Sequence, residues 1–350
     1  MSRRFDSKAQ CVCTVRGSIN HDEYFHVNHI VRPGETLSSY GHESRVGGKG
    51  ANQAVAIARA GGKAQFYGAI GQDGLWIRDR MSAFGIDVSG IIVAEEPTGR
   101  ALIQVEKSGE NSIILYPGAN FSELHEERFK NIGDRWFPES SHILVQNEIP
   151  LRSTYYALEN AKGATVIMNP SPLPSPSEIR NFPWHLVDWL IVNEEEAREL
   201  YESVAESAAS NTPMSIRQLV FHLSAERAFE RTNIVCTLGA DGVLAFVPAF
   251  HRPQTEHEAP SFMHLPAAKL LGEVRDTTGA GDCFTGYFVK GLMDFGPHAV
   301  VGTDIKEHDV ARILKTCVQA AGMCVEKRGT IDSIPTKAEV EERMFSVANN

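Results

Sequence analysis

The sequence contains no run of about 18 consecutive apolar residues, so we expect no membrane-spanning helix. Residues 1–8 are polar and no apolar stretch or small-residue cleavage site follows them, so we expect no secretory leader. Cysteine is scarce, with six in 350 residues and no CxxC pair, which makes disulfides and zinc sites unexpected. The GxxxxGK[ST] pattern is also missing, which excludes a Walker P-loop.

Positive charge is in deficit, with 34 Lys and Arg against 44 Asp and Glu, for a formal net charge of -10. Because such a surface repels phosphate backbones and anionic lipids, we expect neither nucleic acid nor a membrane as a partner. We expect a cytoplasmic location, with a nuclear pool as the alternative. The length and the 42% hydrophobic content allow one large core. We therefore predict a single domain over residues 11–345, preceded by a flexible arm at 1–10.

Apolar, strand-length segments alternate with helix-length segments along most of the chain. This rhythm predicts an α/β fold in which helices cover both faces of a mostly parallel central sheet. The strands predicted for this sheet span 11–15, 64–68, 142–146, 165–169, 189–193 and 234–237. Apolar residues at i, i+3, i+4 and i+7 from Ala51 predict a helix after Gly50. Two irregular segments, 203–232 and 248–271, are interpreted as surface insertions.

Two pairs of alternating polar and apolar stretches, within about 18–46 and 98–117, predict a second and smaller sheet. Their connections, at Arg32–Glu35 and 108–110, have the composition of hairpin turns. We expect these four strands to form a small antiparallel β lid outside the main sheet. Because its edge strands are available for pairing, we also expect a homodimer formed through the lid.

The segment Asp276-Thr277-Thr278-Gly279-Ala280-Gly281-Asp282 is followed by an apolar run with helical spacing. Its glycines therefore lie at a helix N-terminus, where unpaired N–H groups and the helix dipole favour an anion such as phosphate. A carboxylate at 282 would be available to accept a proton from an attacking hydroxyl. The simpler structural interpretation is a glycine turn whose aspartate only caps the helix.

A second motif, Gly47-Gly48-Lys49-Gly50-Ala51-Asn52-Gln53, precedes the first by about 230 residues. Together the two resemble the N-terminal and C-terminal signatures of the ribokinase (PfkB-type) family of carbohydrate kinases, and the resemblance extends from about Val12 to Pro335. It implies a ribokinase-like three-layer α/β/α fold and ATP-dependent transfer of a phosphoryl group to the primary (5-) hydroxyl of a pentose. D-ribose is the first expectation. The alternatives are 2-deoxyribose, another sugar or a nucleoside as substrate, or a non-catalytic sugar or nucleotide sensor.

The resemblance also implies roles for individual residues. Asp282 resembles the catalytic base, and the backbone N–H groups of Gly279, Ala280 and Gly281 resemble the anion hole. The sugar-binding positions are Asn20, Asp22, Gly48, Lys49, Asn52 and Glu148, together with Asp282. The nucleotide-binding positions are Asn193, Thr237, Gly239, Gly242 and Gly281.

Cofactors are implied in the same way, with ATP as the phosphoryl donor, Mg²⁺ near Glu196 and K⁺ as a monovalent activator. The positions that match the monovalent-cation site are Asp276, Thr278, Cys324, Lys327, Gly329 and Ser333. In many relatives an asparagine faces the nucleotide at a position that corresponds here to about Val318–Gln319, where no asparagine is present. The resemblance therefore assigns no contact with the nucleotide base to this position.

Several of these residues also have simpler structural interpretations. Asn20 and Asp22 are typical turn residues, and Asn52 is suited to the first turn of a helix. Acidic residues at 194–196 fit a solvated first helical turn, where they complement the dipole.

Overall fold

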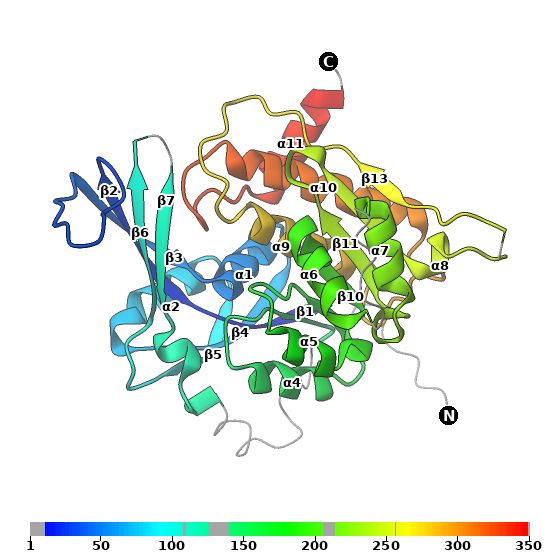
Figure 1. The fold of residues 1–350 in the computed structure, drawn as a ribbon, viewed down its shortest axis with the longest axis horizontal. Coiled ribbons are helices and arrows are strands. Elements are labelled where there is room, and N and C mark those ends of the chain that lie inside the picture. Colours follow the sequence, from blue (N-terminus) through cyan, green and yellow to red (C-terminus); the bar gives the residue numbers. More distant parts are fainter. Residues whose placement is uncertain (1–10, 108–109, 126–139, 206–213, 256, 349–350) are drawn as a thin grey trace.

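A computed structural model describes residues 11–107, 110–125, 140–205, 214–255 and 257–348. The predicted arm at 1–10 and part of the predicted insertion at 203–232 lie outside these residues, and the single-domain boundaries stay a prediction. The described residues form two β-sheets with surrounding helices (Figure 1). None of the helices within these ranges combines the length and the apolar character that crossing a membrane requires.

The larger sheet has nine strands within the described residues and is parallel except at one edge. Parallel pairing joins β11 to β10, β9, β8, β1, β4 and β5 in that spatial order. The bounds of these strands are Asn233–Thr237, Trp189–Asn193, Thr165–Met168, His142–Val145, Val12–Arg16, Lys63–Ile70 and Asp87–Val93. At the other edge β12 (Val243–Phe246) and β13 (Met263–Leu265) are antiparallel. The predicted α/β fold with a mostly parallel sheet is confirmed.

Three strands of this sheet, β5, β12 and β13, were not predicted. The interpretation of 248–271 as a surface insertion is therefore wrong in part, because β13 completes the sheet edge and a short helix, α8 (Pro248–His251), precedes it. With only three residues, β13 is too short to show a period in the sequence. Within 203–232 the structure contains α7 (Ile216–Ala225), whose N-terminus is capped by the Ser215 side chain.

Helices cover both faces of the larger sheet and so form the outer layers of a three-layer fold (Figure 1). One face packs against α1 (Lys49–Arg59), α2 (Leu75–Ala83), α9 (Ala280–Met293), α10 (Glu307–Val325) and α11 (Lys337–Ala348). The other packs against α4 (Leu151–Glu159), α5 (Pro176–Asn181), α6 (Glu194–Val204) and α7.

Side chains of β10 point alternately to the two faces of the sheet, so one continuous apolar run contributes to two hydrophobic cores. Trp189 and Ile191 lie in the core with α1, α9 and α10, whereas Leu190 and Val192 lie in the core with α6 and α7. All four side chains are at most 2% exposed. A strand buried on both faces has no polar alternation, which is why these strands appear as uninterrupted apolar segments.

The smaller sheet has the strand order β3 (Gly41–Gly47), β2 (Asn20–Val27), β6 (Gly99–Glu106) and β7 (Asn111–Tyr116). Each hairpin is antiparallel, and the two hairpins meet through the parallel pair β2–β6. The sheet projects from one side of the molecule, at the left of Figure 1. We call these four strands the lid.

The connection between the sheets positions the site. Strand β2 follows β1 after a short turn, and the lid therefore rises from the edge where the parallel strands have their carboxyl ends. In open α/β sheets this edge is where ligands bind. Polar residues directly after β1, β8, β9, β10 and β11 consequently lie along one border beneath the lid.

Candidate active site

Asp282 lies in the first turn of α9 and only 7% of it is exposed. Each of its carboxylate oxygens accepts a hydrogen bond from an amide on α1. Asn52 Nδ2 donates to Oδ2 at 2.9 Å, and Gln53 Nε2 donates to Oδ1 at 2.9 Å. The side chain therefore points at α1 in a fixed orientation, and the two sequence motifs, 230 residues apart, meet at this carboxylate.

Close packing of α1 on α9 makes this meeting possible. A Cβ atom at Gly286 would lie 2.3 Å from the Cβ atom of Ala56 and 2.8 Å from the carbonyl oxygen of Gln53. Only glycine permits that approach without moving a helix. Small residues along α1 serve the same end, since Ala54 and Ala56 are fully buried.

A cavity of about 240 Å³ opens beside Asp282. It collects residues from the carboxyl ends of β9, β10 and β11, from the start of α1 and from the turn before α9. Its lining is Lys49, Asn169, Ser171, Ile191, Val192, Asn193, Glu196, Thr237, Thr277, Gly279, Gly281, Asp282 and Thr285. The predicted residues that share this space are Lys49, Asn193, Glu196, Thr237, Gly279, Gly281 and Asp282. Four predicted sugar-binding residues, Asn20, Asp22, Asn52 and Glu148, are not among those that line it.

The residues of the predicted anion hole lie at the N-terminus of α9. Gly279 is the N-cap of α9 with φ +78°, a left-handed conformation that favours glycine. A Cβ atom at Gly281 would meet nothing within 4 Å, so this residue borders open space. The first N–H groups of a helix have no partner within it. The N–H of Ala280 donates to the carbonyl oxygen of Thr277 at 3.3 Å, whereas Gly279 and Gly281 line the cavity beside Asp282.

The predicted sugar residues are held in place by their neighbours. Asn20 Oδ1 accepts a hydrogen bond from Asn120 Nδ2 at 2.7 Å. Glu148 Oε2 accepts from Ser18 Oγ at 2.6 Å and from the backbone N–H of Lys49 at 2.9 Å. Asn20 begins β2, Glu148 follows β8 and Lys49 begins α1, so three separate elements converge here.

Two of the predicted sugar-binding residues have a buried acceptor that lacks a partner. Asp22 Oδ1 and Asn52 Oδ1 have no hydrogen-bond partner within the described residues, although Asp22 is 6% and Asn52 5% exposed. A buried acceptor without a donor costs free energy, so such atoms indicate where a ligand supplies hydrogen bonds. Both belong to the predicted sugar-binding set.

Carboxylates outnumber cations in the electrostatic environment of Asp22 and Lys49. Burial raises the pKa of Asp22 to about 8, and the nearby charges of Glu148 and Asp282 add to that shift. Burial acts to lower the pKa of Lys49, but attraction to Asp282, Glu148 and Glu196 outweighs it and raises this pKa. The Lys49 ammonium is thus held charged beside the predicted base.

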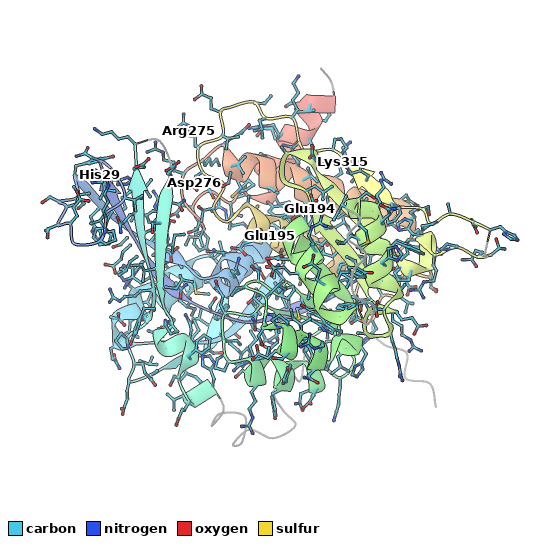
Figure 2. All side chains as sticks on the ribbon, in the orientation of Figure 1. His29, Glu194, Glu195, Arg275, Asp276 and Lys315 are labelled. Atoms are coloured by element: carbon cyan, nitrogen blue, oxygen red, sulfur yellow. The ribbon has the colours of Figure 1, made fainter. Side chains whose placement is uncertain are left out.

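Asn193 and Glu196 both line the cavity and also cap α6. Asn193 Oδ1 accepts from the N–H of Glu196 at 2.8 Å, and Glu196 Oε2 accepts from the N–H of Asn193 at 3.0 Å. This capping box accounts for both residue types structurally. Glu194 and Glu195, labelled in Figure 2, are exposed in the first turn of α6, as their simpler interpretation requires.

The other predicted nucleotide positions differ in placement. Thr237 ends β11 and lines the cavity. Gly239 and Gly242 lie in the following turn, outside the cavity lining. A Cβ atom at Gly242 would lie 2.0 Å from the Leu265 carbonyl oxygen, so this glycine has a packing reason of its own. Gln319, at the position to which the family resemblance assigned no base contact, is buried within α10.

The segments of the predicted cation site are adjacent. Asp276, labelled in Figure 2, accepts hydrogen bonds from the N–H groups of Thr278 and Gly329, each at 3.0 Å. Cys324 Sγ and Ser333 Oγ are 2.9 Å apart. The Lys327 ammonium forms an ion pair with Glu339 at 3.2 Å, so only its backbone carbonyl is left for a cation. The predicted cation residues therefore come from the turn before α9, from the end of α10 and from the segment that follows α10.

Several residues of the site had no role assigned from the sequence, among them Gln53, Asn169 and Ser171. Gln53 belongs to the motif at residues 47–53 but had no assigned role. Its Nε2 donates hydrogen bonds to Asp282 Oδ1 and to Asn169 Oδ1, the latter at 3.0 Å. Asn169 and Ser171 directly follow β9. A polar residue at the end of an apolar parallel strand was the signal that could have identified them.

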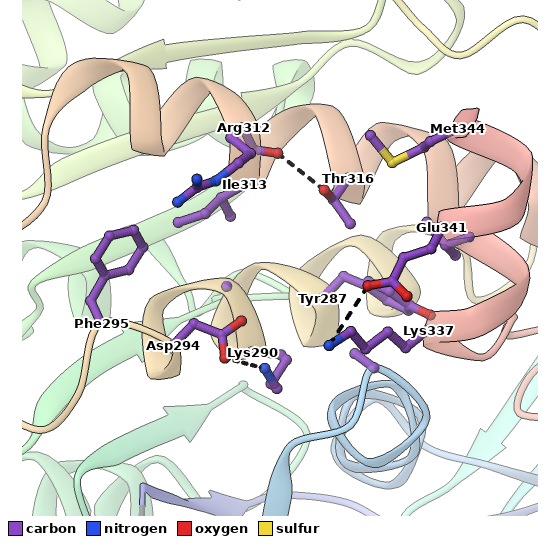
Figure 3. Close-up of a pocket in the computed structure, with 13 residues that line it drawn as sticks. Tyr287, Lys290, Asp294, Phe295, Arg312, Ile313, Thr316, Lys337, Glu341 and Met344 are labelled. Carbon is purple, nitrogen blue, oxygen red and sulfur yellow. Dashed lines mark hydrogen bonds and ion pairs between the residues drawn. The ribbon is translucent and has the colours of Figure 1, made fainter. Parts of the chain in front are cut away.

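A separate cavity of about 250 Å³ lies between α9, α10 and α11 (Figure 3). Its charged side chains are paired with neighbours along their own helices. Lys290 pairs with Asp294, and Lys337 pairs with Glu341 at 3.7 Å. This cavity shares no residue with the one beside Asp282.

Comparison with known proteins agrees with this geometry. Residues 14–337 match the pfkB family carbohydrate kinases. The chain belongs to this family. It is 35% identical to the ribokinase of Haemophilus influenzae over 335 residues, which cover 94% of this chain and 97% of that protein. The predicted family membership is therefore confirmed.

Two solved structures of family members extend the comparison. A ribokinase from Cryptococcus neoformans var. grubii serotype A in complex with ADP is 42% identical, with a TM-score of 0.77 over 95% of this chain and 100% of that one. The Arabidopsis thaliana ribokinase complexed with ribose and ATP is 26% identical, with a TM-score of 0.71 over 95% of this chain and 98% of that one. The predicted ribokinase-like fold is likewise confirmed.

Proposed function

We propose that this protein is an ATP-dependent ribokinase that transfers the γ-phosphoryl group of ATP to the 5-hydroxyl of D-ribose. The observation that carries the proposal is Asp282, whose carboxylate is fixed by Asn52 and Gln53 at the mouth of a glycine-lined helix N-terminus. The similarity to ribokinases that bind ADP, ribose and ATP supports the same substrates.

The residues present suit the chemistry of phosphoryl transfer. Asp282 accepts the proton of the 5-hydroxyl as its oxygen attacks the γ-phosphorus, and ADP leaves with the electron pair of the broken bond. The N–H groups at 279–281 stabilise negative charge on the transferring group. The orphaned acceptors of Asp22 and Asn52 fit a ligand rich in hydroxyl donors, which favours a free sugar.

We propose Mg²⁺ and K⁺ as cofactors of this reaction. Magnesium commonly binds through phosphate oxygens, water and one or two carboxylates, and Glu196 lines the cavity together with Asn193 and Asp282. Bound there, it would neutralise phosphate charge. The backbone and side-chain oxygen atoms of the segments 276–278 and 324–333 support a monovalent cation site. Activity that is equal in potassium, in sodium and without either ion would contradict the K⁺ assignment.

A homodimer through the lid is also proposed. The edge strand β7 exposes four consecutive apolar residues, Ile113, Ile114, Leu115 and Tyr116, to between 47% and 60%. An exposed apolar edge strand is expected to be covered by another chain. Sedimentation should show a dimer that Leu115→Glu converts to monomer, and a monomeric unmodified protein would contradict it. We propose a cytoplasmic location with a nuclear pool as the alternative, which microscopy of the tagged protein would test.

The deciding experiment replaces Asp282 with asparagine and uses Asp294→Asn as the matched control. Asp294 lies beyond the other end of the same helix with its side chain 64% exposed. Loss of a general base lowers kcat by about 10² to 10⁴-fold. We expect that loss for Asp282→Asn, with ribose and ATP still bound, and no change for Asp294→Asn. Full activity of Asp282→Asn would refute the assignment.

Substrate identity is tested by comparing kcat/KM for D-ribose and 2-deoxyribose. A hydrogen bond to a charged group contributes about 1.5–3 kcal/mol, so losing the 2-hydroxyl should cost roughly tenfold or more. Equal kcat/KM values for the two sugars would indicate a kinase that accepts pentoses more broadly. Binding of sugar and ATP without any ADP release, over a full sugar panel, would instead identify a sensor.

A further inference from the structure

Arg45 stands on lid strand β3, directly opposite Asp22 of β2 in the antiparallel register. Residues that oppose each other in such a pair share a face of the sheet. The burial pattern of β2 alternates so that Asn20, Asp22 and Tyr24 face inward. Arg45 therefore shares the inner face of the lid with the predicted sugar ligand Asp22, although no motif assigned it a role.

The guanidinium of Arg45 is held on three sides. Its central carbon lies 4.8 Å from the centre of the Tyr24 ring. One nitrogen forms an ion pair with Glu43, whose other oxygen is 2.8 Å from His26 Nε2. On the third side a Cβ atom at Gly329 would lie 2.9 Å from Arg45 Nη1, so the group abuts that loop. The Arg45 side chain is only 18% exposed.

The charges around Asp22 show how the Arg45 guanidinium affects the ionisation of Asp22. Glu148, after β8, and Asp282, on α9, both act to keep Asp22 neutral, and Arg45 is the group that opposes them. Tyr24, also on β2, has its own pKa raised by burial and then by the charges of Asp22 and Asp276. Three carboxylates thus crowd the sugar side of the site, and Lys49 is drawn to Asp282, Glu148 and Glu196.

We infer that Arg45 is a positioning residue for the sugar site, whose immobilised guanidinium serves as the counter-charge of the Asp22 carboxylate. The inference rests on the proposed function. A carboxylate that accepts hydrogen bonds from two sugar hydroxyls is stronger than a neutral acid in the same place. Arg45 acts through Asp22 and touches neither the phosphate nor the proton in transit, so its effect falls on sugar binding rather than on the chemical step.

The test compares Arg45→Gln and Arg45→Lys with the unaltered enzyme, using Arg78→Gln on the surface of α2 as control. Arg45→Gln should raise the KM for ribose about ten- to a hundredfold with kcat changed less than about threefold. Arg45→Lys should recover most of the affinity, because it keeps the charge. Melting temperatures of the four proteins verify folding.

Ribose affinity measured by calorimetry without ATP provides a readout independent of turnover. In the unaltered enzyme, affinity should rise with pH as Asp22 ionises, and Arg45→Gln should move that rise to higher pH. In an Asp22→Asn background the pH dependence should vanish and Arg45→Gln should cause no further loss. Additive losses in the double variant, or an unshifted pH profile, would overturn the inference. Absence of ribose binding by the unaltered protein would instead refute the proposed function.

Discussion

Replacing Asp22 with asparagine should stabilise the ligand-free protein at neutral pH while weakening ribose binding. Asp22 is 6% exposed and its pKa is raised by burial to about 8. In the unfolded chain the same carboxyl has its ordinary pKa of about 3.9. The folded protein therefore holds a proton that the unfolded chain releases, and asparagine resembles the neutral acid without that proton.

The magnitude and its sign follow from proton linkage. Between about pH 4 and pH 8 the folded state binds one proton more than the unfolded state at this site, so stability falls as pH rises. Each pH unit in that window contributes about 1.4 kcal/mol, so at pH 7 the cost approaches about 4 kcal/mol. Below pH 4 the carboxyl is neutral in both states and the cost disappears.

Urea unfolding at pH 5 and at pH 7.5, without sugar, measures the effect. We expect the free energy of unfolding of Asp22→Asn to exceed that of the unaltered protein by an amount that grows by several kcal/mol between these pH values. Asp79→Asn, which replaces a side chain 71% exposed, provides the control with no such growth. A difference that stays constant with pH would refute the raised pKa of Asp22.

Two further predictions address packing and the cap of α6. Gly286→Ala should destabilise the protein by about 1–3 kcal/mol and lower kcat, because the added methyl group would push α1, with Asn52 and Gln53, away from Asp282. A melting temperature and a kcat equal to those of the unaltered enzyme would contradict this prediction. Glu196→Gln should preserve the capping box and the melting temperature but raise the Mg²⁺ concentration needed for half-maximal activity, whereas an unchanged Mg²⁺ titration would limit Glu196 to capping.

The predictable parts of this protein are those that chemistry imposes locally. A buried parallel strand must be an apolar run, so β10 was predicted with its observed bounds, Trp189–Asn193. A helix N-terminus that receives an anion needs glycine and small residues, so the turn before α9 was identifiable from its sequence. In both cases the determining interactions lie within a few residues of one another.

The unpredicted parts depend on contacts between distant segments. Strand β13 exists because β12 pairs with it, and its three residues carry no period of their own. The role of Gln53 appears only when α1 packs on α9, and Arg45 acquires its surroundings from β2 and from the loop at Gly329. A single sequence contains these residues but not their partners, so their roles require the fold.

The contacts around Asp22 and Asn52 leave hydrogen-bond acceptors on the sugar side of the site without donors when no ligand is bound. Asp22 and Asn52 each bury an acceptor that lacks a partner in the described residues, and carboxylates are placed close enough to disfavour ionisation. Each orphaned acceptor costs about 1–3 kcal/mol in the free protein. A polyol that donates to these atoms removes that cost on binding, whereas a sugar lacking the matching hydroxyl leaves it in place. Selectivity for a hydroxyl-rich substrate then follows from the strain of the empty site as much as from the contacts of the filled one.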